Sequence, residues 1–256
     1  MQSARNSTGG GSGRLYDSES RLRKAQKILT ILQEELGDSL AELRGLDVGC
    51  ANGVIANHLA GSCRSLFGVD PEYRHFAIVP GEKCALLAGD GVAIPFPDDS
   101  FDLVICAQVY EHAANPEAMV AEIARVLKHG GVVFFSGPNK YSVIEDHYGV
   151  PFLSWLPKAA ADWIVRLMGK GSQYEEHPRS LSELKALWGG FEIKDVTLQL
   201  ILHPDKYGLT REVKGMKWMS RLPVRPLELL RGLYPNYNWI LRKKTELVRS
   251  GTSRVS

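Results

Sequence analysis

The sequence lacks the features of a zinc-binding, secreted or membrane-spanning protein. Its four cysteines form no C-x-x-C pair, so we expect reduced, buried thiols in a cytoplasmic protein and no zinc knuckle. It has no run of about 18 apolar residues, which a membrane-spanning helix requires. Residues 1–13 are rich in Ser, Gly and Asn and lack the apolar core of a signal peptide, so we expect a disordered tail.

The chain also lacks a strong charge of either sign. Its formal net charge is +2, and it shows no base-stacking motif, so a nucleic-acid partner is not expected. A length of 256 residues with 44% hydrophobic residues is ordinary for one large domain. We therefore expect a single domain over residues 14–256, with a core at 43–140.

Short apolar runs alternate with helical patterns through the first half of the chain. Strands are expected at 43–48, 65–69, 84–88, 101–107, 132–135, 191–200 and 237–241. Helices are expected at 20–36, 54–60, 72–79, 115–127, 160–168 and 181–188, with Asn115 as a cap and Gly130-Gly131 as a stop. This alternation predicts an α/β fold with a doubly wound, mostly parallel sheet and helices on both faces.

A loop of small residues follows the first expected strand, from Asp47 to Gly53. Such a loop lets a ligand approach the backbone at the beginning of a helix, where free amide groups point outward. The dinucleotide pattern G-x-G-x-x-G fails at Ala51 and Val54, which disfavours a nicotinamide-dependent oxidoreductase. The remaining alternatives are a different nucleoside ligand or a plain tight turn.

Acidic residues also end the next two expected strands. Asp70 can accept hydrogen bonds from both hydroxyls of a ribose. Asp90 can accept one from an adenine amino group while the Gly91 amide faces a ring nitrogen. Either carboxylate alone is typical of a solvated loop, but with Asp47 they predict a nucleoside site at one edge of the sheet.

The spacing from Asp47 to Gly53 resembles the first motif of class I S-adenosylmethionine-dependent methyltransferases, acidic-x-Gly-x-Gly-x-Gly, with Ala51 at the middle glycine. Ile94–Val104, Val109–His112 and Arg125–Gly131 resemble further segments of the type 11 group. The resemblance implies a Rossmann-like, seven-stranded sheet whose last strand is antiparallel, S-adenosylmethionine as cofactor, and methylation of a small molecule on oxygen or nitrogen. The cofactor-binding residues that it implies are Asp47, Gly49, Cys50, Ala51, Asn52, Gly53, Asp70, Pro71, Asp90, Gly91 and Gln108.

Candidate catalytic residues follow the fourth and fifth expected strands. Glu111 and His112 are expected near the sulfonium, with His112 as a base or acceptor contact, or alternatively a structural histidine. His147, with Glu145, either orients an acceptor hydroxyl or lies at the rim. Relatives that methylate quinone precursors hold a divalent metal with Glu-x-x-Glu-His. Here Gln108 replaces the first carboxylate, so no metal is expected.

Inserts are expected at 141–180 and 203–235. Tyr148, Phe152, Trp155 and Trp163 either line an apolar acceptor pocket or pack on the sheet, and the polar run Glu175-Glu176-His177 closes that pocket. The segment 203–244 is basic and amphipathic. It either contacts an anionic membrane or a lipid-like acceptor, or it is a solvated outer face, which we favour. The acceptor, the oligomeric state and a catalytically inactive, partner-binding alternative stay open.

Overall fold

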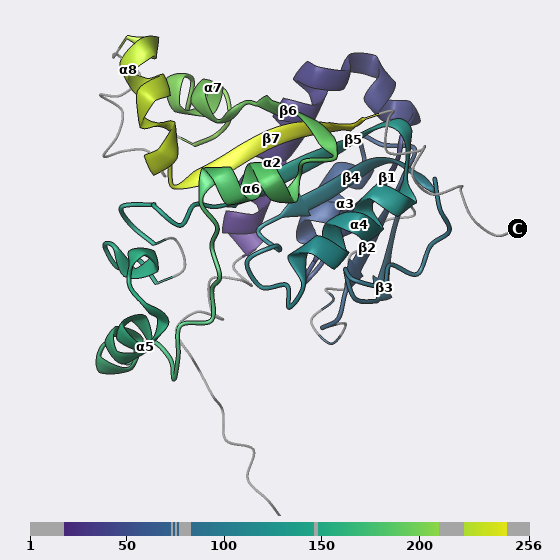
Figure 1. Cartoon of the computed structure of the whole chain (residues 1–256). Helices are drawn as coiled ribbons and strands as arrows, with labels where there is room; N and C mark the ends of the chain where they lie inside the picture. The colour runs from purple at the N-terminus through teal and green to yellow at the C-terminus, as the bar shows by residue number, and fades with distance from the viewer. Residues whose placement is uncertain are drawn as a thin grey trace, which may run out of the picture.

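A computed structural model describes residues 18–72, 74, 76, 83–145, 148–209 and 223–244. The described strands form one seven-stranded sheet in the order β3-β2-β1-β4-β5-β7-β6 (Figure 1). The strands are β1 Arg44–Val48, β2 Ser65–Asp70, β3 Cys84–Ala88, β4 Phe101–Ala107, β5 Leu127–Pro138, β6 Phe191–Asp195 and β7 Asn236–Lys243. Strands β1 to β5 are parallel, and β7 is antiparallel to both of its neighbours. The expected fold is therefore confirmed, including its antiparallel last strand.

Helices cover both faces of this sheet. They are α2 Ser18–Leu36, α3 Val54–Ala60, α4 Pro116–Val126, α5 Lys158–Leu167, α6 Leu181–Leu187, α7 Thr197–Leu202 and α8 Val224–Leu229, with 3-10 turns η1 Gly37–Glu42, η3 Leu153–Trp155 and η5 Leu230–Leu233. Helices α2, α3 and α7 pack on one face, and α4 and α6 pack on the other. Among the described residues, no helix is both long and apolar enough to cross a bilayer.

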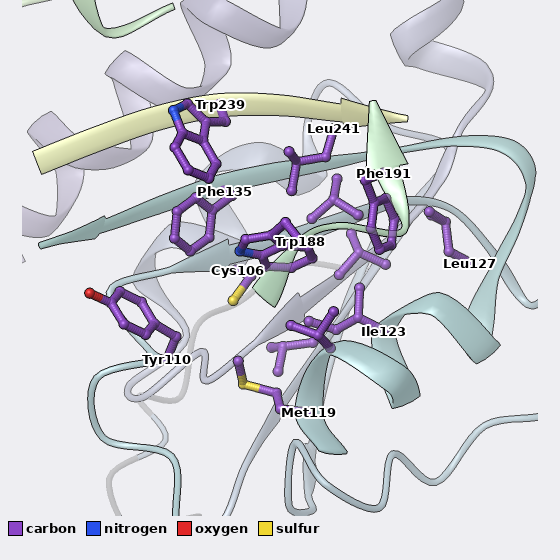
Figure 2. Packing of buried hydrophobic residues seen from close by; sticks show 14 of the residues in the cluster. Cys106, Tyr110, Met119, Ile123, Leu127, Phe135, Trp188, Phe191, Trp239 and Leu241 are labelled. Carbon is purple, nitrogen blue, oxygen red and sulfur yellow. The ribbon is translucent and has the colours of Figure 1, made fainter. Parts of the chain in front are cut away.

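The core on the α4 side is rich in aromatic rings. The ring centroid of Phe135 lies 5.2 Å from those of both Trp188 and Trp239 (Figure 2). Alternation along β5 sends Phe135 to this face and Phe134 to the α2 side, as the period of a strand requires. Tyr110 closes the edge of this cluster, and its hydroxyl points away from it (Figure 2). Tyr110 thus anchors in the core the segment that follows β4.

Helix α4 begins as expected and ends earlier. Asn115 accepts a hydrogen bond from the Ala118 amide at 3.0 Å, so the expected cap is present. The helix ends at Val126, and β5 begins at Leu127 rather than at residue 132. The reason is that Leu127 pairs with Phe101 across β4 and is fully buried there. The Gly130-Gly131 pair therefore lies inside a strand with a register shift.

The expected strand over 191–200 is wrong in its second half. Strand β6 ends at Asp195, whose carboxylate accepts a hydrogen bond from the Thr197 amide at 2.9 Å. That bond begins helix α7, which buries Leu200 against the α2 side of the sheet. Of the weak helix expected at 72–79, most residues lie outside those that the structure describes.

Candidate active site

The loop after β1 has an unusual backbone. Gly49, Ala51 and Gly53 all have positive φ angles of 70°, 47° and 79°. The Gly49 and Cys50 amides donate to the Val69 carbonyl at 2.8 and 3.2 Å, which fixes the loop to the end of β2. A left-handed alanine is strained, because its Cβ crowds the following carbonyl. The loop therefore departs from the family pattern at the residue where its conformation is least suited to a side chain.

Asp70 stabilises this strained loop from the end of β2. Its Oδ2 accepts a hydrogen bond from the Ala51 amide at 2.8 Å, and its Oδ1 accepts one from the Glu72 amide at 2.8 Å. The side chain is buried. Because each carboxylate oxygen can accept two hydrogen bonds, both oxygens keep a site for another donor.

Neighbouring side chains leave no room at the loop's glycines. A Cβ built on Gly49 would lie 2.5 Å from Cγ2 of Val109, and one on Gly53 would lie 2.4 Å from Cδ1 of Leu86. Both contacts are far shorter than real Cβ contacts. The glycines are thus required by packing of the loop itself, and Val109 places the segment after β4 directly against Gly49.

Asp47 lies beneath the loop near the end of β1. The carboxylate is buried, and its Oδ2 has no hydrogen-bond partner among the described residues. Burial raises the pKa of Asp47 to about 7; the Asp70 carboxylate adds to this rise, and Arg21 opposes it. A nearby positive charge would favour the ionised form of this side chain.

Asp90 and Gly91 follow β3 at the same edge of the sheet. The Asp90 carboxylate accepts a hydrogen bond from the Val92 amide at 3.1 Å and is exposed. A Cβ on Gly91 would lie 3.2 Å from both Val48 and Met119, so its backbone passes close to the end of β1. Asp47, Asp70 and Asp90 thus lie at or beyond the ends of three neighbouring parallel strands.

The remaining expected cofactor residues take structural places around this edge. Pro71 is exposed, Cys50 is buried, and the side-chain Oδ1 of Asn52 accepts a 3.4 Å hydrogen bond from the Val54 amide. Gln108 has a left-handed φ of 60°, and its amide nitrogen donates to Oδ1 of Asn236 at 2.9 Å. Its side chain therefore ties the end of β4 to β7.

Tyr110 joins the segment after β4 to the insert that follows β5. Its hydroxyl donates to the Pro138 carbonyl at 2.5 Å and accepts from the Arg179 amide at 2.9 Å. The His177 amide donates to the Glu111 carbonyl at 3.1 Å. These bonds bring residues 174–179 against Glu111 and His112, about 65 residues earlier in the sequence.

This arrangement brings Glu111, His112 and Glu176 together. One ligand atom from each lies within 4.8 Å of the others, and His112 Nδ1 is 3.4 Å from Glu176 Oε2. Both glutamates are buried, whereas His112 is partly exposed. Sequence reasoning placed Glu176 only in a polar run that closes a pocket, because nothing in its spacing indicates the contact with residues 111 and 112.

The electrostatics of this cluster follow from burial and like charges. Burial raises the pKa of Glu176 to about 9, and the carboxylates of Glu111, Glu145 and Glu175 add to this rise. Burial lowers the pKa of His112, so the ring is neutral near pH 7. The buried Tyr174 hydroxyl has no hydrogen-bond partner among the described residues; burial raises the pKa of this phenol, and the charges of Glu145 and Glu176 add to the rise. The site therefore holds a buried cluster of carboxyl groups, in which Glu176 tends to keep its proton, next to a neutral imidazole.

The other expected acceptor residues are placed differently. His147 lies outside the residues that the structure describes. Glu145 is buried, and its Oε2 accepts from the Tyr148 amide at 2.5 Å, so it does not lie at an exposed rim. Of the four aromatic residues expected to line a pocket or pack on the sheet, Tyr148 is buried against Tyr174. The other three, Phe152, Trp155 and Trp163, are exposed instead.

Comparisons with known proteins agree with this geometry. Residues 46–135 match a family described as "Methyltransferase domain". A Bordetella avium protein named "Ubiquinone biosynthesis O-methyltransferase" is 29% identical over 185 residues, which are 68% of this chain and 72% of that protein. A Paracidovorax citrulli protein of the same name is 34% identical over 143 residues, 50% of this chain and 58% of that protein.

A solved structure shows the same fold. The crystal structure of an S-adenosylmethionine-dependent methyltransferase from Mesorhizobium loti aligns with a TM-score of 0.53 and 17% identity, over 83% of this chain and 96% of that one. The methyltransferase-domain match, these relatives and the sheet order support a class I S-adenosylmethionine-dependent methyltransferase. The chain is an enzyme whose methyl donor is S-adenosylmethionine, as the first motif indicated.

Proposed function

We propose that the enzyme transfers the methyl group of S-adenosylmethionine to an oxygen of a small aromatic acceptor related to a quinone. The observation that carries this proposal is the cluster of Glu111, His112 and Glu176 beside the loop over β1. A partly exposed, neutral imidazole flanked by carboxylates suits an acceptor that must lose a proton. The relatives named as ubiquinone biosynthesis O-methyltransferases support an acceptor of this class.

The cofactor would lie across the ends of β1, β2 and β3. Asp70 would accept hydrogen bonds from the ribose hydroxyls with the two sites that its backbone contacts leave open. Asp90 and Gly91 would meet the adenine. The methionine part would lie over the loop at Gly49 and Ala51, where Asp47 would favour its positive charge.

His112 would serve as the general base. As the acceptor oxygen forms a bond to the methyl carbon, the carbon–sulfur bond breaks, and a ring nitrogen of His112 takes the hydroxyl proton. Its lowered pKa keeps the ring neutral and able to accept that proton near pH 7. Glu176, 3.4 Å from Nδ1, would orient the ring. The cofactor carries the reactivity, and the protein aligns acceptor, methyl carbon and sulfur.

The donor set also fits a divalent cation. Two carboxylates and an imidazole with atoms within 4.8 Å of one another match the ligand types of such ions. The carboxylate that Gln108 lacks would come from Glu176, on the insert. We infer that Glu111, His112 and Glu176 would hold a cation, which would displace the proton of Glu176 and lower the pKa of an acceptor hydroxyl. With the cation bound, His112 would be its ligand and not the general base.

A labelled-methyl assay tests the proposed function. The enzyme would be offered S-adenosylmethionine carrying a labelled methyl group and a panel of catechols, phenols and amines of similar size. We expect label on a catechol or phenol oxygen and a loss of rate in His112→Ala that exceeds its loss of cofactor affinity. Transfer to amines alone would overturn the oxygen acceptor. Cofactor binding without transfer to any of them would favour the catalytically inactive alternative.

A further inference from the structure

Large apolar side chains are exposed in two segments of the described chain. Nine of the fourteen lie between residues 141 and 168, and four lie between 224 and 233. The first group is Tyr141, Val143, Ile144, Phe152, Trp155, Leu156, Trp163, Leu167 and Met168, and the second is Val224, Leu229, Leu230 and Leu233. The fourteenth, Leu22, lies on α2. We call the two groups together the apolar face. Single exposed apolar residues are ordinary, but concentration of this kind marks an interaction surface.

Helix α5 is apolar on both sides. Ala161 and Val165 are buried against the insert, as a helix that packs on one side requires. On the other side, Trp163 and Leu167, one turn apart, are 61% and 69% exposed. The outer side of α5 thus presents two large apolar side chains to solvent beside the charged Asp162 and Arg166.

An aromatic group beside α5 is held in place to face outward. The rings of Tyr141 and Phe152 lie 5.8 and 5.2 Å from that of Trp155 in edge-to-face contacts. The Trp155 indole donates inward to the Ser142 carbonyl at 2.9 Å. Phe152 has a left-handed φ of 58°, an uncommon conformation for a bulky residue. The backbone is thus strained at the residue that presents this ring.

The two segments lie at the end of the sheet where the active site is. Figure 1 shows α5 at the lower left and α8 at the upper left of the molecule, both beyond the end at which β7 begins. There β7 pairs with the carboxyl end of β5, Pro138 opposite Asn236. Asn139 donates from its amide nitrogen to the carbonyls of Gly232 and Tyr234 at 2.8 Å. The chain just before the first segment is therefore bonded directly to the end of the second.

Charge on these segments favours an anionic partner. Among the described residues 141–170, the exposed charged side chains are Lys158 and Arg166, both cations, and Lys158 pairs with the less exposed Asp162 at 3.2 Å. On the second segment, Arg225 and Arg231 accompany the one acid, Glu228. Exposed tryptophan, tyrosine and leucine with basic neighbours is the composition that proteins place at a lipid headgroup boundary.

The basic segment 203–244 offers fewer unpaired positive charges for a partner than its sequence indicated. Lys206 pairs with Glu34 at 2.6 Å, and Arg242 pairs with Glu35 at 3.0 Å, so these two charges join the end of the chain to α2. Lys243 donates to the Ala124 carbonyl at 2.9 Å inside the fold. Residues 210–222 lie outside the described residues. The interaction surface is therefore indicated by the exposed apolar side chains and not by the pattern of charges in the sequence.

We propose that the apolar face docks the enzyme on a phospholipid bilayer that carries anionic headgroups. Trp163, Leu167 and Leu229, which is 87% exposed, enter the headgroup boundary, and Arg166 and Arg225 meet the lipid phosphates. A bilayer covers both segments at once, because it needs no matched shape from its partner. Docking in this orientation places the active-site edge of the sheet toward the membrane, where an apolar acceptor partitions.

Vesicle binding of the full-length enzyme tests this proposal. Vesicles of phosphatidylcholine, with or without phosphatidylglycerol, would be sedimented with wild type, Trp163→Glu, Leu167→Glu and Leu22→Glu. We expect binding that requires phosphatidylglycerol. Binding should fall at least about tenfold in Leu167→Glu and Trp163→Glu, because each replaces an apolar side chain that the bilayer would bury. Leu22→Glu is the matched control, since Leu22 is 46% exposed but lies on α2, and it should bind as wild type does.

Two outcomes would overturn the proposal. One is equal vesicle binding by wild type, Leu167→Glu and Trp163→Glu. The other is an absence of vesicle binding together with self-association in the ultracentrifuge that Leu167→Glu abolishes, which would assign the apolar face to a second copy. Methyl transfer to a water-soluble acceptor should be unchanged in Leu167→Glu, so failure of docking is distinguishable from failure of the proposed function. Circular dichroism spectra would show that each variant is folded.

Discussion

The Asp70 carboxylate accepts a hydrogen bond from the Ala51 amide at 2.8 Å, so the side chain that we propose to hold the ribose also shapes the loop. Ala51 has a left-handed φ of 47°, and this bond helps to hold the residue in that conformation. In most proteins a residue in such a position is glycine. The relationship gives Asp70 two roles that substitutions can separate.

Removing the carboxylate should weaken cofactor binding. Asp70→Ala removes the two proposed ribose contacts and the bond to Ala51, and we expect a loss of about 1–3 kcal/mol in the free energy of binding S-adenosylmethionine. Isothermal titration with the cofactor and with its demethylated product measures the change. Glu72→Gln, an exposed acid two residues further on, is the control and should bind normally. An unchanged affinity in Asp70→Ala would remove this residue from the site.

Restoring the family glycine should relieve strain in the loop. We expect Ala51→Gly to raise the free energy of unfolding by about 0.5–1 kcal/mol, because glycine adopts a positive φ without steric cost. Ala118→Gly, in the first turn of α4, is the matched control and should lower stability by a similar amount. Denaturant unfolding measures both. A loss in Ala51→Gly would mean that the loop is not strained at this residue.

The sequence predicts the sheet better than it predicts the site. Local patterns were sufficient for β3, β4 and α3, whose bounds match the expected ranges, and the cap at Asn115 has a local cause. The early start of β5 was not predictable in this way, because Leu127 is drawn into the sheet by its partner on β4. Secondary structure set by a distant strand leaves no periodic signal nearby.

The two halves of the candidate site likewise differ in whether the sequence predicts them. The acids at the ends of β1, β2 and β3 follow from strand order, because parallel strands end at one edge. Glu176 reaches His112 through bonds of Tyr110 and Glu111 to residues 177 and 179, which no spacing rule connects. Nor does the sequence show that Trp163 is exposed, since an amphipathic pattern indicates which residues share a face but not what covers it.

The buried Asp47 should make stability depend on pH. Its pKa is raised from an ordinary 3.8 to about 7, so between these values the folded chain holds a proton that the unfolded chain has lost. Stability should therefore fall as pH rises from about 4 to about 7, by up to roughly 4 kcal/mol from this group, and level off above pH 7. Asp47→Asn should flatten this slope. Urea unfolding of both proteins across the range tests it, and parallel slopes would show that Asp47 does not titrate this way.

Substitution of Glu176 distinguishes a specific cation site from a general effect of nearby acidic residues. Glu176→Gln removes a buried carboxyl group whose Oε2 lies 3.4 Å from His112, whereas Glu175→Gln removes an exposed one next to it. If the cation is held by Glu111, His112 and Glu176, Mn²⁺ should bind stoichiometrically to wild type and Glu175→Gln. Its affinity should fall at least about tenfold in Glu176→Gln, because one of three protein ligands is lost.

Electron paramagnetic resonance of free Mn²⁺ reports binding without any methyl acceptor. Equal weakening in the two variants would reduce the effect to long-range charge. No binding by wild type would leave His112 to act without a metal.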